Sequence, residues 1–301
     1  MNYYNEIKNK LIDNEVYKRV KDYSKNRNDL NTYYEVGKLL IEAQGGEERA
    51  KYGDRLIKEY SERLYNELGK KYDITTLKRY RQFYLKIEKG AALRHQLSWT
   101  HYRELLTLDN INELNYYVEI TIEQNLSYRQ LREKIKTKEY QRLDNNTKLK
   151  LINKEKLDIK DNIKNPIVIH NKNNLDKENI SEKVLQRLIL EDISSFLKEL
   201  GVGFCFIGSE YKIKIGNTHN YIDLLLFNYI YNCFIVIELK VCELKKEHIG
   251  QIEVYMNYID RHIKSINQDK TIGIIISRRD NNYYIEYSSD KRILTREYIL
   301  T

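Results

Sequence analysis

The chain has 301 residues, of which 41% are hydrophobic and 32% are charged, and its formal net charge is +8. This apolar content excludes a disordered chain, because it provides enough surface to offset the entropy of folding, and the length predicts two domains. No apolar run approaches the roughly 20 residues of a bilayer span, and the first residues mix acids and bases without an apolar block, so we expect a cytoplasmic protein with no membrane association.

The N-terminal part of the chain predicts an all-helical domain, which we place at 1–141. Apolar residues recur at helical spacing in two segments that Gly45 and Gly46 separate. These positions are Tyr33, Val36, Gly37, Leu39 and Leu40 in the first segment, and Leu56, Ile57, Tyr60, Leu64 and Leu68 in the second. Further helices are expected after Asp73, Ser98 and Ser127, which are residue types that cap helix N-termini.

A basic segment lies within this domain at Lys70–Arg94, with eight Lys or Arg against Asp73 and Glu88. In the helix expected after Asp73, the spacing turns Leu77, Tyr80, Tyr84 and Ile87 inward. The same spacing turns Lys78, Arg79 and Arg81 outward. A short turn followed by a basic helix suits a DNA groove, and phosphates favour such a patch, so these three residues are candidates for nucleic-acid binding. A solvated helix face, or a surface that binds a protein partner, is the alternative interpretation.

Residues 142–180 lose the periodic pattern. Asn, Lys and Asp dominate there, and the chain's one proline, Pro166, lies in the middle. This composition predicts a polar linker, with a short strand near Pro166–Ile169.

Residues 181–301 alternate between helical and strand patterns and predict an α/β sandwich. An amphipathic helix begins at Ser181 and ends at Gly201, and a second helix is expected from about Lys245 to Ser265. Strands are expected at 204–215, 220–227, 232–240 and 271–277, with a shorter one at 281–289.

Two of these strands carry charged residues in apolar surroundings. Asp223 lies in the strand 220–227, and Glu238 and Lys240 lie on one face of the next, because side chains alternate along a strand. Strand pairing can bring Asp223 beside Glu238, where a hard divalent cation such as Mg²⁺ would relieve their repulsion. Lys240 could then orient a water molecule or stabilise developing charge. Charged residues at the end of a core strand are the structural alternative.

The same segments carry a family resemblance. IDLLLF followed by FIVIELK resembles the PD-(D/E)XK nuclease motif, and Gln251 with Tyr255 resembles its QxxxY extension. The strings IELKVCELKKEHIGQIEVYMNYID and TIGIII resemble the nuclease-like domain of the YhcG family of bacterial proteins, and YYEVGKLLIEAQ and LSWTHYRELL resemble that family's helical domain. The resemblance implies an α + α/β protein, in which a helical N-terminal domain precedes a restriction-endonuclease-like sandwich.

Carried over by position, the resemblance implies Asp223 and Glu238 as metal ligands and Lys240 as the catalytic lysine. Gln251 would support the active site, and Tyr255 would contact nucleic acid beside it. The family also has an acid on the helix after the linker, for which Glu191 is the better candidate and Glu199 the weaker one. Ile222 stands where the motif has proline.

We therefore expect a Mg²⁺-dependent endonuclease, with Mn²⁺ as a substitute ion, that hydrolyses phosphodiester bonds in DNA. The helical domain would hold the DNA or a protein partner, and a homodimer would provide two active sites. The alternatives are a non-catalytic nucleic-acid-binding module and a partner-recruiting subunit of a mobile-element or defence assembly.

Overall fold

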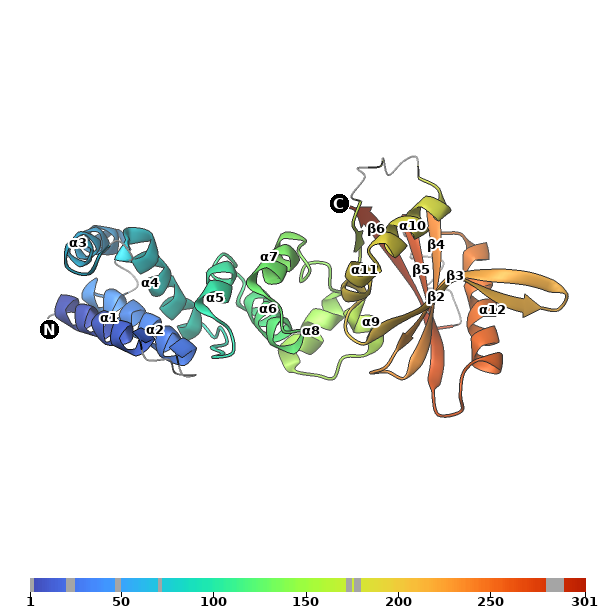
Figure 1. The fold of residues 1–301 in the computed structure, drawn as a ribbon, viewed down its shortest axis with the longest axis horizontal. Helices are drawn as coiled ribbons and strands as arrows, with labels where there is room; N and C mark the ends of the chain where they lie inside the picture. The colour runs from blue at the N-terminus through green and yellow to red at the C-terminus, as the bar shows by residue number, and fades with distance from the viewer. Residues whose placement is uncertain are drawn as a thin grey trace. The chain divides into compact units, whose positions relative to one another are not determined.

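The chain is represented by a computed structural model that describes residues 3–19, 25–46, 50–69, 72–171, 175, 180–279 and 290–301. It divides into two units, Met1–Tyr140 and Gln141–Thr301, whose elements are drawn in Figure 1. The strand expected at 281–289 and the basic residues Lys70 and Lys71 lie outside the described residues.

The first unit is helical throughout its described residues. Its helices are α1 (Tyr3–Arg19), α2 (Lys25–Ala43), α3 (Ala50–Leu68), α4 (Ile74–Glu88), α5 (Trp99–Leu105), α6 (Ile111–Glu123) and α7 (Tyr128–Lys136). Asp73 and Ser127 cap α4 and α7, because their side chains accept hydrogen bonds from backbone N–H groups in the first turn.

Helices α2 and α4 pack closely at Gly37. A Cβ atom at this position would lie 2.2 Å from the carbonyl oxygen of Tyr80, so only glycine allows this approach. The ring of Tyr80 stacks on that of Tyr33 with centroids 4.4 Å apart. The inward face of α4 was only partly predicted: Leu77 and Tyr80 are buried as expected, but the face continues through Phe83 and Lys86 rather than Tyr84 and Ile87.

The second unit begins at Gln141, so the linker prediction for 142–180 is wrong. This segment forms α8 (Asn145–Asn153), α9 (Ile159–Asn162) and the strand β1 (Ile167–Ile169), which pairs in parallel with β6 (Ile293–Leu300). Its polar composition reflects helix capping, since Asp144 and Asp158 cap α8 and α9. The guanidinium of Arg142, which is buried, donates to the carbonyl of Pro166 at 2.7 Å and to the carboxylate of Glu199.

The sheet has six strands in the order β1-β6-β5-β4-β3-β2. Its other strands are β2 (Phe204–Ile215), β3 (Thr218–Asn228), β4 (Cys233–Glu243) and β5 (Asp269–Arg279). Strands β2, β3 and β4 are antiparallel, whereas β4, β5 and β6 are parallel. The four strands expected between 204 and 277 are confirmed; β6 was not predicted.

Helices cover both faces of this sheet (Figure 1). The helix expected from Ser181 breaks at Asp192 into α10 (Glu182–Glu191) and α11 (Ile193–Leu200), because the Asp192 side chain caps the second part. These helices bury one apolar face of the sheet, including Leu224, Ile237 and Leu239. Helix α12 (Lys246–His262) buries the other, including Leu225, Val236 and Ile275. In the described part of the chain, no helix is long and apolar enough to cross a membrane.

Candidate active site

Antiparallel pairing of β3 with β4 brings the two predicted carboxylates together. Leu224 pairs with Ile237, and Asp223 and Glu238 are the next residues along the two strands. Asp223 Oδ2 accepts a hydrogen bond of 2.7 Å from the backbone N–H of Leu239. From α10, Gln186 Nε2 donates to the carbonyl oxygen of Asp223 at 2.9 Å. Both the side chain and the backbone of Asp223 are therefore held in place.

Glu238 and Lys240 lie side by side on β4, as their alternation predicted. Their residues are 2% and 8% exposed, and Lys240 Nζ lies 3.4 Å from Glu238 Oε2. The same ammonium lies 3.4 Å from Oε2 of Glu182, the first residue of α10. Lys240 thus connects β4 to α10 through its contact with Glu182.

One oxygen of Glu238 is left without a partner. Glu238 Oε1 is buried and accepts no hydrogen bond, although a buried anionic oxygen is costly unless something compensates its charge. A positive charge or a proton at Oε1 would provide this compensation.

Burial and crowding perturb the acid–base properties of the cluster. Burial, followed by the charge of Asp223, raises the pKa of Glu238 to about 8 against the opposing effect of Lys240. Burial also raises the pKa of Asp223, although the Leu239 N–H and Lys240 oppose it. Burial tends to lower the pKa of Lys240, but Glu238, Glu182 and Asp223 outweigh it and raise the pKa, so Lys240 stays protonated. Uncompensated, the two acids hold protons at neutral pH more readily than ordinary carboxyls do.

Gln251 and Tyr255 lie one turn apart on α12, and Gln251 Nε2 donates to the Tyr255 hydroxyl at 3.0 Å. Burial raises the pKa of Tyr255, and the charges of Glu238 and Asp223 add to this effect, whereas the hydrogen bond from Gln251 opposes it. Tyr255 is only 5% exposed, and its contact with nucleic acid stays a prediction.

The helix acid that contacts the cluster is Glu182, at the start of α10. Glu191 is exposed and lies 3.8 Å from Arg187, nine residues and about 13 Å along α10 from Glu182. Glu199, on α11, binds Arg142 and accepts from the backbone N–H of Val168 at 3.0 Å. Glu182 is the acid that reaches the cluster. Its sequence signal is the i, i+4 spacing with Gln186, which places both side chains on the face of α10 toward Asp223.

The carboxylates fit a hard divalent cation. No group of three or more His, Cys, Asp or Glu side chains that could hold a metal occurs among the described residues. Mg²⁺, however, is usually bound by one or two carboxylates together with water and substrate phosphate oxygens. Asp223 and Glu238 match this donor set, and Glu238 Oε1 is available for it.

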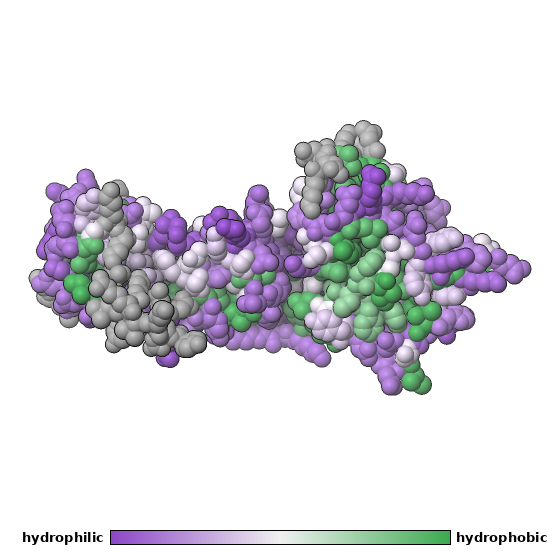
Figure 2. Space-filling model, viewed as in Figure 1, coloured by the Kyte–Doolittle hydropathy of each residue, from purple (hydrophilic) through white to green (hydrophobic). Residues whose placement is uncertain are grey.

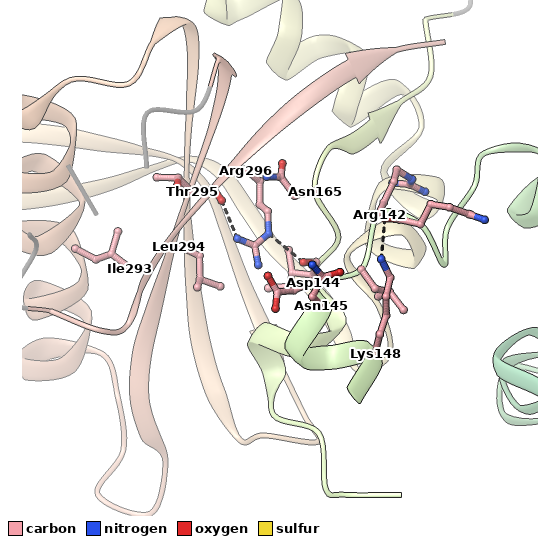
Figure 3. A pocket seen from close by; sticks show the side chains of 12 residues that line it. Arg142, Asp144, Asn145, Lys148, Asn165, Ile293, Leu294, Thr295 and Arg296 are labelled. Carbon is pink, nitrogen blue, oxygen red and sulfur yellow. Dashed lines mark hydrogen bonds between the residues drawn. The ribbon is translucent and has the colours of Figure 1, made fainter. Parts of the chain in front are cut away.

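A pocket of about 400 Å³ lies elsewhere in the second unit (Figure 3). Its lining includes Arg142, Asp144, Lys148 and Arg296, and it includes none of the predicted site residues. Arg296 donates to the backbone carbonyls of Ile163 and Thr295 at 3.0 and 2.8 Å. The contact with Ile163 connects the 141–165 segment to β6, which is a structural role.

The basic face of α4, in the first unit, is smaller than the sequence predicted. Lys78 is exposed, Arg79 and Arg81 are half-buried, and Arg81 donates to Gln44 Oε1 at 3.3 Å. Lys86 is buried and donates to the carbonyl of Leu108, and Arg94 is paired with Glu119 at 2.8 Å. Of the basic segment, Lys78 and Arg79 are the better candidates for a phosphate contact.

The second unit has the arrangement of a PD-(D/E)XK nuclease domain. Strands β2, β3 and β4 are antiparallel, and helix α12 crosses over to the parallel strand β5. An aspartate lies on β3, and a Glu-x-Lys sequence lies on β4. A family model described as the YhcG PDDEXK nuclease domain matches residues 160–301, and one described as the DUF1016 N-terminal domain matches residues 9–142. Between them, the two models match both units of the chain, and the nuclease domain is that of the YhcG family, as its sequence motifs indicated.

One relative and two solved structures illustrate the similarity. Over 284 residues the chain is 26% identical to "Putative nuclease YhcG" of Escherichia coli (strain K12), a match that covers 81% of this chain and 75% of that protein. A repair endonuclease from Pyrococcus abyssi is 18% identical with a TM-score of 0.31, covering 40% of this chain and 47% of its own. A complex of EndoMS with double-stranded DNA is also 18% identical with a TM-score of 0.31, covering 42% and 46%.

Proposed function

We propose that this nuclease hydrolyses phosphodiester bonds in DNA as a divalent-metal-dependent endonuclease, with Mg²⁺ as its ion and Mn²⁺ as a substitute. The observation that carries this proposal is the unpartnered, buried Glu238 Oε1 beside Asp223 and Lys240. A cation at this position would compensate both carboxylates, and they would then stay ionised at neutral pH.

The residues of the cluster have distinct roles in this proposal. Asp223 and Glu238 would hold the ion, which when bound polarises a phosphate oxygen and lowers the pKa of a bound water. Lys240, kept protonated by its carboxylate neighbours, would orient the attacking water and stabilise negative charge that develops on the phosphate. Glu182 positions the Lys240 ammonium, and Gln251 with Tyr255 supports the carboxylates from α12.

The proposal is tested by incubating supercoiled, linear and single-stranded DNA and RNA with Mg²⁺, Mn²⁺ or EDTA. Metal-dependent cleavage of DNA is expected, and Asp223→Asn or Lys240→Ala should each reduce its rate at least about a hundredfold, because each removes a group that acts on the developing charge. Asp223→Asn should also weaken Mn²⁺ binding measured by calorimetry, whereas Lys240→Ala should retain it.

Glu182→Gln provides a further test, with Glu191→Gln as its matched control on the same helix. Glu182→Gln should slow cleavage because the Lys240 ammonium loses one of its two carboxylate partners. Glu191→Gln should cleave DNA like the unchanged protein. Failure of the protein to cleave any of these substrates, or equal activity of wild type and Asp223→Asn, would contradict the proposal.

We also propose that Lys78 and Arg79 on α4 contribute sequence-independent contacts to DNA phosphates, a role to which half-buried Arg81 contributes less. The salt dependence of DNA binding by the Lys78→Ala/Arg79→Ala protein tests this assignment. An unchanged dependence would assign this face to a protein partner instead.

A further inference from the structure

The hairpin of β2 and β3 extends beyond the active site. Residues 211–222 form its outer part, with Gly216 at the turn, and the register pairs Lys212 with Tyr221 and Lys214 with His219. Figure 1 shows this hairpin projecting from the sheet past α12.

One face of the hairpin is anchored to the second unit. Ile213 and Ile222 are buried in the apolar core on the α12 side of the sheet, with Tyr211 and Ile215 packed against that core. Tyr258, on α12, accepts a hydrogen bond from the backbone N–H of Lys214 at 3.5 Å. The outer hairpin is thus held in a defined orientation.

The other face of the hairpin is exposed and basic. Alternation turns Lys212, Lys214, His219 and Tyr221 away from α12, and all four are exposed. Residues 211–222 contain no Asp or Glu. Within the described part of the chain, neither Lys212 nor Lys214 forms an ion pair, and Tyr221 is 53% exposed. The outer hairpin shows mainly hydrophilic surface in Figure 2.

This face is close to the reacting position. Tyr221 lies two residues before Asp223, so the Lys212–Tyr221 pair is about 7 Å from Asp223 along the strand and the Lys214–His219 pair about 13 Å. A DNA strand advances about 3.4 Å per nucleotide, so the two pairs are roughly two nucleotides apart, and the outer pair is roughly four nucleotides from Asp223.

We propose that this hairpin face binds the DNA strand next to the scissile phosphate. Lys212 and Lys214 would contact backbone phosphates, and the ring of Tyr221 would stack against a base. The proposal rests on the proposed function and extends it by naming the surface that positions the substrate. Residues 211–222 contain no acidic side chain that would repel a phosphate. A uniformly charged polyanion therefore suits this face better than an acidic peptide that also carries basic residues.

The test is a titration of fluorescently labelled duplex DNA with the full chain, over a series of salt concentrations in EDTA. For Lys212→Ala/Lys214→Ala, the slope of log K against log salt concentration should decrease in magnitude by about two, and binding should be weaker at low salt. Tyr221→Ala should weaken binding about fivefold or more through lost stacking, whereas Tyr221→Phe should bind like the unchanged protein.

The matched control is Lys198→Ala/Lys270→Ala, which removes two exposed lysines near the opposite end of the sheet. It should change neither the affinity nor the slope by as much as the hairpin variant does. Circular dichroism should show the same melting temperature for all variants, since the substituted side chains are exposed.

An unchanged slope for the hairpin variant, or an equal change in the control, would overturn the proposal. This outcome is separable from failure of the proposed function. If the chain cleaves DNA but the hairpin variants bind normally, only the hairpin assignment is wrong. If the hairpin variants lose binding but no substrate is cleaved by the unchanged protein, the binding surface stands and the catalytic proposal fails.

Discussion

Of the residues that form the cluster, Glu238 has the environment that is least favourable for its own charge. It is almost fully buried, one of its oxygens has no partner, and its pKa is raised to about 8. Such an arrangement stabilises the fold less well than an apolar residue would, because desolvation of a carboxylate is incompletely offset. A buried carboxylate that destabilises the fold in this way is typical of a functional site.

The raised pKa predicts how the metal-free protein responds to pH. Between about pH 4.5 and pH 8, folded Glu238 keeps a proton that the unfolded chain has released. The folded state then binds more protons, so the free energy of unfolding should fall as the pH rises through this window. Urea unfolding in EDTA at pH 5 and pH 8 measures this decrease in the free energy of unfolding. The decrease should be smaller for Glu238→Gln than for the unchanged protein.

Mn²⁺ should reverse this trend, because the ion binds the ionised carboxylates and displaces the proton. Its affinity should increase by up to about tenfold per pH unit below pH 8. A stability that rises with pH in EDTA, or is equally pH-dependent in Glu238→Gln, would show that other groups dominate the titration.

Strand alternation made the central residues of the site predictable. Asp223, Glu238 and Lys240 interrupt apolar strands, and a period of two fixes which of their neighbours share a face. Glu182 was not predictable in this way. Its contact with Lys240 depends on the rotation of α10 about its axis, which is set by packing on the sheet. The role of Tyr255 came from the QxxxY resemblance alone, and alternation along a strand carries no information about a residue on α12.

Among the elements, the α2–α4 pair shows how one residue sets a helix packing distance. Gly37→Ala should destabilise the first unit by about 1–3 kcal/mol, because its Cβ would overlap the backbone of Tyr80 and the helices must separate. Gly250→Ala on α12 is the matched substitution, since no atom lies within 4 Å of its Cβ position. It should stabilise the second unit by about 0.5–1 kcal/mol through helix propensity.

The fluorescence of the chain's single tryptophan distinguishes the effect of Gly37→Ala from that of Gly250→Ala. Trp99 packs against Tyr33 and Tyr80 at centroid distances of 4.8 and 5.3 Å, so its fluorescence reports unfolding of the first unit next to the α2–α4 contact. Gly37→Ala should shift the fluorescence transition in urea to lower concentration, and Gly250→Ala should leave it unchanged. A stabilising effect of Gly37→Ala would mean that the helices can move apart without loss of packing.

At the level of the whole molecule, composition predicted two folding units but misplaced the start of the second. A linker and a set of capped helices use the same Asn, Asp and Lys residues, and only tertiary partners distinguish them. Here those partners are distant in sequence: Ile167 pairs with Tyr298, Asn171 donates to the carbonyl of Thr301 at 2.8 Å, and Arg142 binds Glu199.

Two fragments test this boundary. A fragment of residues 141–301 should unfold cooperatively, because it retains β1, α8 and α9. A fragment of residues 181–301 leaves Glu199 without Arg142 and the Val168 N–H, and breaking a buried pair of this kind costs about 3–5 kcal/mol. Removal of β1 also exposes the edge of β6. Because domains are stabilised by only about 5–15 kcal/mol, the shorter fragment should lose its cooperative thermal transition in circular dichroism. Equal melting temperatures for the two fragments would instead show that the sandwich folds without the 141–180 segment, as the polar composition of that segment suggested.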